Sequence, residues 1–530
     1  MKQKLFSFWP LLGLVTLVNL IQAALTGLLK DEAYYAYFAK NLDWGYFDHP
    51  PMVALLALAA KLSWLGTLGP RFLSVLLASV SYYLLYHTLD PKVRNTFPAL
   101  LFFAVLLSLP LVHFYGFLTL PDSGTLFFSA LFFYSYKKHL NGNSLAFITL
   151  GVALSGLMYS KYTGILIILA TLFSNLKLIR DYKAWMAVLL GLLLFTPHLW
   201  WLWEHNWVTV RFHFSERPNH AYEFLPFTGG YIINAIGLFG LLFFDTYKAL
   251  FNRKSTALNP FERALKWSVW GILLFFFFSS FSKKSQLQWL LPAVYPAFLL
   301  LFLQLHTSGE GVRKRVKNLS IISLVLLLTL RVFLSSEQLS PLHLEPHGVA
   351  RWAKNLEKQE PNTPVIFIDS YQRAALFEFY TGATALSYNT LGYRPNQYDY
   401  DSRWNDLNQT QVIAISSKPL ENGLRIESPK KGDYFWKTKS YLEQESMQDY
   451  QLEPSGKLTG VTNQDGSYFI AYLDQYKRAQ EIEPLAIADT TKLSKRQLVK
   501  LSHYPYFRIG KASTGLPPKI MHQFAIPVSQ

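Results

Sequence analysis

Long apolar runs are the feature of this chain that most constrains its fold. FWPLLGLVTLVNLIQAALTGLL begins at Phe8 and ILLFFFFSSF ends at Phe281, and runs of this kind approach the length of about 20 residues that crosses a bilayer. Of the 530 residues only 16% are charged, against about 25% in soluble globular proteins. Lipid must therefore solvate much of the molecule, and a purely soluble fold is excluded.

The hydropathy pattern predicts a polytopic α-helical membrane protein with about eleven transmembrane helices. Lys2 and Lys4 precede the first span, which lacks a small-residue cleavage site and is therefore expected to be a retained helix rather than a signal peptide. The predicted spans cover residues 6–28, 70–89, 96–115, 122–136, 145–159, 162–176, 184–203, 229–247, 267–281, 287–305 and 318–334.

The formal net charge is +16, and the basic residues that cause it are distributed as the predicted topology requires. If the N-terminus is cytoplasmic, alternate connections are cytoplasmic, and all of these carry Lys or Arg, as the positive-inside rule requires. The excess of basic residues therefore does not indicate a nucleic-acid partner. The chain has no cysteine, so a disulfide framework and a cysteine-based metal site are both excluded.

The remaining connections and the tail are expected outside the cytoplasmic membrane, in the periplasm or beyond. Domain 1–334 is the membrane part, with an outer loop at about 29–69, and residues 335–530 form a polar tail. In this tail PVIFID and QVIAIS are typical of strands and RAALFEFY of a helix, which predicts a small soluble α/β domain. A few isolated cations lie in the outer connections, where a bound anion would explain them.

The first outer loop begins with DEAYYAYFAKNL at Asp31 and continues with WGYFDHPPM. Adjacent carboxylates at a membrane surface are costly unless cations or a substrate compensate them. Tyr34, Tyr35 and Phe38 recur at helical spacing, which predicts a helix lying along the membrane interface. As an alternative, Asp31 and Glu32 cap that helix and the tyrosines form an aromatic belt.

The segment DEAYYAYFAKNLDWGYFDHPP resembles the first periplasmic loop of bacterial GT-C glycosyltransferases related to the dolichyl-phosphate-mannose-protein mannosyltransferases (glycosyltransferase family 39) and to the lipid A aminoarabinose transferases. Later segments agree in order: TLPDSGTLFFSALFFY, GLMYSKYTGIL, FTPHLWWLWEHNW, SYQRAALFEFYTG and GYRPNQYDY. The resemblance spans nearly the whole chain and implies the GT-C fold.

The resemblance implies that Asp31 is the general base that deprotonates the acceptor hydroxyl, with Glu32 in support. The leaving group would be a polyprenyl monophosphate, which needs cations more than a general acid. Members of this family are inverting, which implies a single displacement. Lys161 matches a lysine that approaches the lipid phosphate, although a lysine whose charged end reaches the membrane surface is the alternative.

Further residues are candidates for donor or substrate binding. Lys283 and Lys284 precede Gln288 and Trp289, where relatives often carry a polar residue followed by tryptophan near the sugar pocket; one of the two lysines could be an interface anchor. The remaining candidates are Tyr35, Asp48, His49, Asp122 and Arg211.

Three of these assignments have alternatives. Asp48 and His49 could position phosphate or hold a weakly bound divalent metal, although no metal is required. Asp122 would orient sugar hydroxyls, or else only cap a helix. Arg211 lies in a polar loop that is equally compatible with simple solvation. Tyr34 stands where the aminoarabinose transferases have an arginine, which puts that phosphate contact in doubt.

The sequence thus predicts a membrane glycosyltransferase that moves a sugar from a polyprenyl-phosphate donor to an acceptor in lipid A, an envelope glycan or a protein. A lipid or glycan flippase or transporter is the alternative, because it would share the hydropathy. In a transporter, however, the ionisable residues should lie near the bilayer midplane, in broken helices of pseudo-repeated halves.

Overall fold

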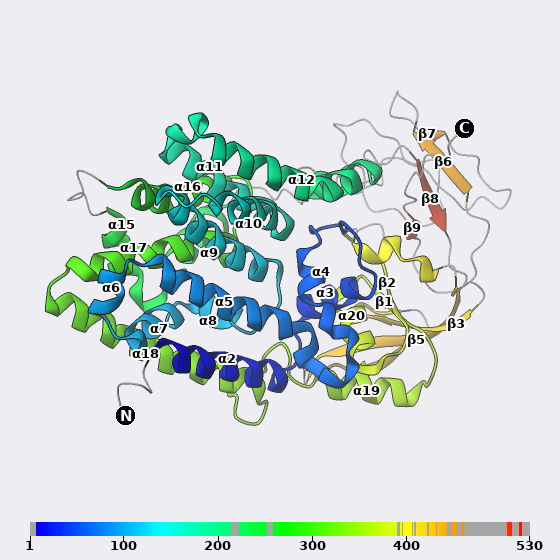
Figure 1. The fold of residues 1–530 in the computed structure, drawn as a ribbon. Coiled ribbons are helices and arrows are strands. Elements are labelled where there is room, and N and C mark those ends of the chain that lie inside the picture. The colour runs from blue at the N-terminus through cyan, green and yellow to red at the C-terminus, as the bar shows by residue number, and fades with distance from the viewer. Residues whose placement is uncertain are drawn as a thin grey trace.

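The chain forms a bundle of helices with an α/β domain at one end (Figure 1). The computed structural model describes residues 7–213, 222–251, 258–389, 393–394, 396–404, 406–407, 410–420, 423–430, 432–442, 448–452, 458–459, 506–510 and 519–521. Beyond residue 442 the described residues are short strands, and the architecture below rests mainly on the residues before them.

Each predicted apolar span coincides with helix in the bundle. The helices are α2 (Phe8–Leu25), α5 (Phe72–Thr88), α7 (Ala99–Leu107), α8 (Pro110–Tyr115), α9 (Pro121–Leu140), α10 (Ala146–Ser160), α11 (Ile165–Ser174), α12 (Tyr182–Glu204), α14 (Gly230–Gly237), α15 (Phe243–Phe251), α16 (Pro260–Ser279), α17 (Val294–Thr307) and α18 (Glu310–Ser335). Short helices α6 (Pro91–Thr96) and α13 (Val208–Arg211) lie between them.

Two predicted spans are broken rather than continuous. The 96–115 span divides into α7 and α8 because Pro110, which cannot continue a helix, begins the second piece. The 229–247 span bends by 92° between Leu225–Gly237 and Gly240–Phe251, where Gly240 adopts φ +54°. Within the described residues, five helices are long and apolar enough to cross a membrane, or six if the bent pair is one span. The number eleven remains a prediction.

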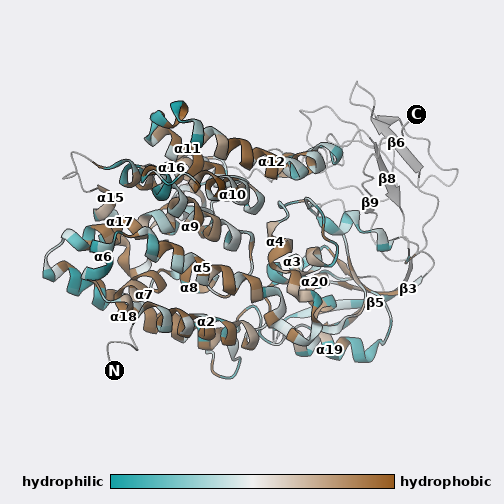
Figure 2. Ribbon diagram, in the orientation of Figure 1, coloured by the Kyte–Doolittle hydropathy of each residue, from teal (hydrophilic) through white to brown (hydrophobic). Residues whose placement is uncertain are grey.

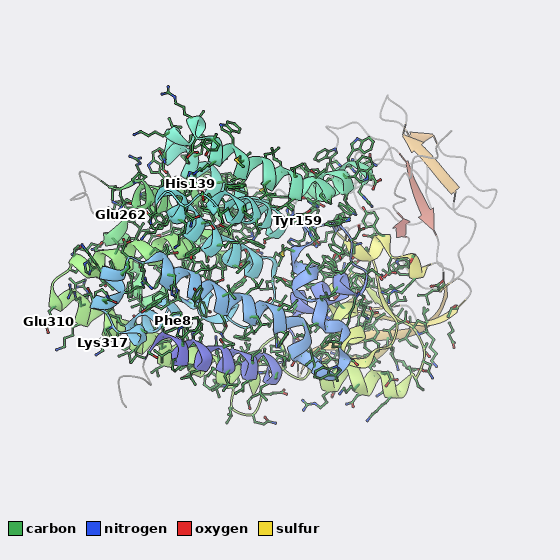
Figure 3. All side chains as sticks on the ribbon, viewed as in Figure 1. Phe8, His139, Tyr159, Glu262, Glu310 and Lys317 are labelled. Carbon is green, nitrogen blue, oxygen red and sulfur yellow. The ribbon has the colours of Figure 1, made fainter. Side chains whose placement is uncertain are left out.

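The bundle is polar at the end opposite the α/β domain. Glu262, Glu310 and Lys317 lie at that end (Figure 3), whereas the middle of the bundle is apolar (Figure 2). Ion pairs at this end join helices that are distant in sequence, with Lys137 bound to Asp90. An apolar middle with a polar end is typical of a multi-pass membrane protein.

The tail contains a five-stranded sheet in the order β2-β1-β3-β5-β4. β1 is parallel to both β2 and β3, and β5 is antiparallel to β3 and β4. The elements are α19 (Val349–Gln359), β1 (Val365–Ile368), α20 (Tyr371–Thr381), β2 (Ala385–Tyr388), β3 (Thr410–Ser416), β4 (Leu424–Glu427) and β5 (Tyr434–Leu442). A second sheet holds β6 (Gln448–Leu452), β7 (Leu458–Thr459), β8 (Tyr506–Gly510) and β9 (Lys519–Met521). The predicted strands and helix correspond to β1, β3 and α20.

The loop of residues 29–69 packs against the tail. It contains α3 (Lys30–Lys40), α4 (Met52–Leu56) and the 3₁₀ helices η1 (Leu58–Lys61) and η2 (Ser63–Arg71). Every residue of α3 from Glu32 to Ala39 is buried, and its aromatic side chains share one hydrophobic core with β1, β3 and α20. The predicted helix is confirmed, its aromatic side chains pack against protein, and its position along the membrane interface stays a prediction.

Candidate active site

Asp31 lies in the first turn of α3, where the helix dipole favours a negative charge. Its Oδ1 accepts a 2.7 Å hydrogen bond from Nε2 of Gln372, in the first turn of α20. Within the described part of the chain, Oδ2 has no hydrogen-bond partner. Burial raises the pKa of Asp31 above its ordinary value, and the Gln372 hydrogen bond opposes that rise. This carboxylate is held on one side and open on the other.

Glu32 is fully buried and paired with Arg71, which is equally buried. The guanidinium donates to both Glu32 oxygens, from Nε at 2.8 Å and from Nη2 at 2.5 Å. Its other N–H groups donate to the carbonyls of Ala23, Thr26 and Gly27. Glu32 also accepts hydrogen bonds from the backbone N–H groups of Leu29 and Thr119. The capping interpretation thus holds for Glu32 and not for Asp31.

Asp122 and Lys161 form a second ion pair. Asp122 lies in the first turn of α9, and both of its oxygens accept from Lys161 Nζ, at 2.9 and 3.0 Å. Gly124 permits this approach, because a Cβ there would lie 2.5 Å from Oγ of Ser160, at the end of α10. The described residues show no side-chain cap of α9 by Asp122, and the Lys161 ammonium binds the Asp122 carboxylate.

Asp48 is buried and contacts a residue of the tail. Its Oδ2 accepts a 2.5 Å hydrogen bond from Arg394 Nη2, while Oδ1 is buried with no partner among the described residues. The Arg394 guanidinium lies over the rings of Tyr371 and Phe212, at 4.7 and 5.1 Å from their centroids. The pair joins the outer loop to the tail and leaves one carboxylate oxygen available.

His49 and Tyr35 contact each other instead of sharing a ligand with Asp48. The Tyr35 hydroxyl lies 3.0 Å from His49 Nε2. Among the described residues, no group of three or more His, Cys, Asp or Glu side chains is arranged to hold a metal ion. Asp48 binds Arg394 and His49 contacts Tyr35, and a weak metal site at Asp48 and His49 stays a prediction.

The adjacent candidates Lys283 and Lys284 differ in their contacts with the acidic site. Lys283 Nζ donates to the His213 carbonyl at 2.9 Å, and His213 Nε2 lies 2.9 Å from the Asp48 carbonyl. Lys284 is exposed and lies 5.5 Å from the ring centroid of Phe227. Lys283 is thus linked to the acidic site, whereas Lys284 is not.

The last three candidates are Gln288, Trp289 and Arg211. Gln288 Nε2 donates to Gln286 at 2.9 Å, and the Trp289 ring packs 5.8 Å from that of Phe276. Arg211 ends the short helix α13, beside the Phe212 ring that Arg394 covers.

Tyr115 shows that the acidic residues form one cluster. Its buried hydroxyl lies within electrostatic range of Asp31, Glu32 and Asp122, and Asp48 in turn acts on Asp31. The structure therefore gathers four carboxylates at the junction of bundle and tail, and within the described part of the chain two of them have an oxygen without a hydrogen-bond partner. Such a cluster can accept a proton and bind hydroxyl groups.

Three residues of this site, Arg71, Gln372 and Arg394, were not singled out from the sequence. Arg71 offered a signal, because it is a cation at the outer edge of an apolar span. Gln372 and Arg394 lie in the segments SYQRAALFEFYTG and GYRPNQYDY, which supported the family resemblance. Their contacts across more than 300 residues have no signature in a single sequence.

The fold is that of a multi-pass helical bundle with an α/β domain at one end, and the comparisons relate it to the GT-C glycosyltransferases. The family model of dolichyl-phosphate-mannose-protein mannosyltransferase matches residues 48–201. The structure superposes on ArnT from Cupriavidus metallidurans bound to undecaprenyl phosphate with a TM-score of 0.57 and 14% identity, covering 81% of this chain and 97% of that one. The apo state of the same protein gives a TM-score of 0.58 with 14% identity, covering 82% and 97%.

A curated relative is the lipid A galacturonosyltransferase RgtD of Rhizobium johnstonii, 24% identical over 293 residues. The match covers 52% of this chain and 60% of the relative, so the chain spans less than two thirds of that protein. The predicted relation to the GT-C glycosyltransferases of the mannosyltransferase family is confirmed by these matches.

Proposed function

We propose that the protein is an inverting glycosyltransferase that moves a sugar from a polyprenyl-phosphate donor to a hydroxyl or phosphate acceptor on the outer face of the cytoplasmic membrane. The observation that carries the proposal is the Asp31 carboxylate, with Oδ1 held by Gln372 and Oδ2 open. A general base needs one oxygen free to take a proton and a fixed orientation toward it.

For a hydroxyl acceptor, the reaction is a single displacement. Asp31 Oδ2 takes the proton of the hydroxyl as its oxygen forms a bond to the anomeric carbon of the donor. The bond from that carbon to the phosphate oxygen breaks, and its electron pair leaves with the polyprenyl phosphate. The proton ends on Asp31, so the charge is balanced without a covalent glycosyl-enzyme intermediate.

Lys161 is the cation proposed to stabilise the leaving phosphate. Its ammonium has three N–H groups, and the described contacts use it only toward Asp122. A phosphate could therefore bind beside Asp122 without breaking that pair. Electrostatic stabilisation of this kind acts where charge develops in the transition state.

The relatives support a lipid-linked donor and leave the acceptor open. ArnT was crystallised with undecaprenyl phosphate, and RgtD is named for transfer to lipid A. We propose a polyprenyl-phosphate sugar as donor for this chain, and lipid A, an envelope glycan or a protein as acceptor. Mass spectrometry of lipid A and envelope glycoproteins from a deletion strain would identify the acceptor.

The proposal predicts that Asp31→Asn abolishes transfer, because the amide keeps the shape of the side chain but cannot take the proton. The rate should fall by about 10² to 10⁴, measured with a radiolabelled polyprenyl-phosphate sugar once the deletion strain has shown which sugar is transferred. Binding of undecaprenyl phosphate and thermal stability should be unchanged. Activity above about a third of the wild-type rate would remove Asp31 from the role of base.

A further inference from the structure

The tail contributes a side chain directly to the candidate base. Gln372 lies in the first turn of α20, which follows β1 with Ser370 as its N-cap residue. β1 is paired on both sides, with β2 and with β3, so α20 begins directly after an interior strand of the sheet. Gln372 is therefore presented from a rigid element and not from a loose loop.

The contact fixes one orientation of the Asp31 carboxylate. The terminal torsion of an aspartate is broad and nearly two-fold, so an unrestrained carboxylate can turn. The 2.7 Å bond from Gln372 Nε2 engages Oδ1 alone. In the described residues Oδ2 has no partner, and the bond therefore determines which oxygen stays available.

The two helices that carry this contact are held together along their lengths. Lys40 of α3 binds Glu378 of α20 at 2.7 Å, and the N–H of Leu28, just before α3, donates to the Tyr380 hydroxyl at 2.7 Å. The two helices also share a hydrophobic core. The relative position of Asp31 and Gln372 thus does not depend on their own hydrogen bond.

We propose that Gln372 is a positioning residue: the tail holds the Asp31 carboxylate through this amide so that Oδ2 faces the acceptor hydroxyl. The inference rests on the proposed function and deepens it, since it makes the tail part of the reaction centre. Gln372 does not touch the reacting atoms and acts through Asp31.

The proposal also predicts a pH dependence, because Gln372 opposes the effect of burial on the pKa of Asp31. Without the amide, the pKa rises further, and Asp31 is deprotonated only at higher pH. The acid limb of the rate profile should then move to higher pH. The other groups that face Asp31 are Glu345, Asp48, Arg394, Tyr35, Tyr115 and Tyr371.

Two variants of similar shape test the proposal in the full-length protein. Gln372→Met keeps the length of the side chain without a donor, and Gln372→Glu places a second carboxylate beside Asp31. We expect Gln372→Met to lower kcat about tenfold or more, to leave KM for the donor within about twofold, and to shift the acid limb upward. Gln372→Glu should shift it further, because like charges disfavour ionisation. Gln359→Met, on the exposed end of α19, is the matched control.

The outcomes separate this proposal from the proposed function. If Asp31→Asn is inactive while Gln372→Met keeps the wild-type kcat and acid limb, the positioning role is overturned alone. A loss of kcat in Gln372→Met with an unmoved acid limb would indicate a merely structural role and also overturns it. If Asp31→Asn is as active as the wild type, the proposed function itself fails.

Discussion

Two ion pairs lie where the bundle meets the tail, one fully buried and one partly buried, and they differ in how completely their hydrogen bonds are used. In the Glu32–Arg71 pair, all five guanidinium N–H groups and both carboxylate oxygens are engaged within the protein. In the Asp122–Lys161 pair, one ammonium binds one carboxylate. The Glu32–Arg71 pair has no unused donor for a substrate, so its role is structural. In the Asp122–Lys161 pair the Lys161 ammonium has a third N–H group, so this pair is the better candidate site for a phosphate.

The largest effect on stability should come from removing one partner of the Glu32–Arg71 pair. Arg71→Met leaves Glu32 charged and buried, which costs about 3 to 5 kcal/mol, and it removes the donors that join the end of α2 to η2. We expect a large fall in thermal stability in detergent. Arg351→Met is the control, since Arg351 and Glu337 form an exposed pair that contributes about 0 to 1 kcal/mol. Equal melting temperatures for the two variants would contradict the structural role of Arg71.

Substitutions in the Asp122–Lys161 pair should affect ligand binding more than folding. If Lys161 binds phosphate, Lys161→Met should weaken binding of undecaprenyl phosphate by about tenfold or more, while Lys161→Arg retains part of the affinity with altered geometry. The double variant Asp122→Asn with Lys161→Met avoids leaving a buried charge and should bind equally weakly. Lys138→Met, near the opposite end of bundle helix α9, is the control. Near-wild-type affinities in all variants would make Lys161 a structural residue.

The smallest difference is expected between the adjacent lysines. Lys283 donates to the carbonyl of His213, which in turn contacts Asp48, whereas the exposed Lys284 lies 5.5 Å from the ring centroid of the buried Phe227. Lys283→Ala should lower the transfer rate about two- to tenfold, the effect of one hydrogen bond to a charged group or less. Lys284→Ala should stay within about twofold of wild type, as surface substitutions usually do. A larger loss for Lys284 would reverse the assignment.

Much of the fold could be predicted from the sequence, and the errors have local causes. The apolar spans, the strands β1 and β3 and the helix α20 follow from composition and periodicity. The break before Pro110 was missed because the residues on both sides are equally apolar. The burial of α3 was missed because an aromatic stripe is the same whether lipid or another domain covers it.

The candidate site was only partly predictable. Asp31 and Asp48 lie within electrostatic range of each other, and Asp122 pairs with Lys161. Gln288 binds Gln286, Trp289 packs near Phe276, and the roles of all these residues stay predictions. Arg71 could have been found as a cation at the edge of an apolar span. Arg394 and Gln372 could not, since their partners are 346 and 341 residues away in the sequence.

The sequence by itself determined that this chain enters a membrane, where its helices lie, and that an acidic pair stands at the start of the first outer loop. Partition into lipid depends on the summed hydropathy of neighbouring residues, which a sequence displays directly. Only the tertiary structure decided the different roles of Asp31 and Glu32, which are adjacent in the chain. Arg71 binds both oxygens of Glu32, whereas Gln372 binds only one oxygen of Asp31. The difference arises because the packing of distant segments sets the hydrogen-bond partners.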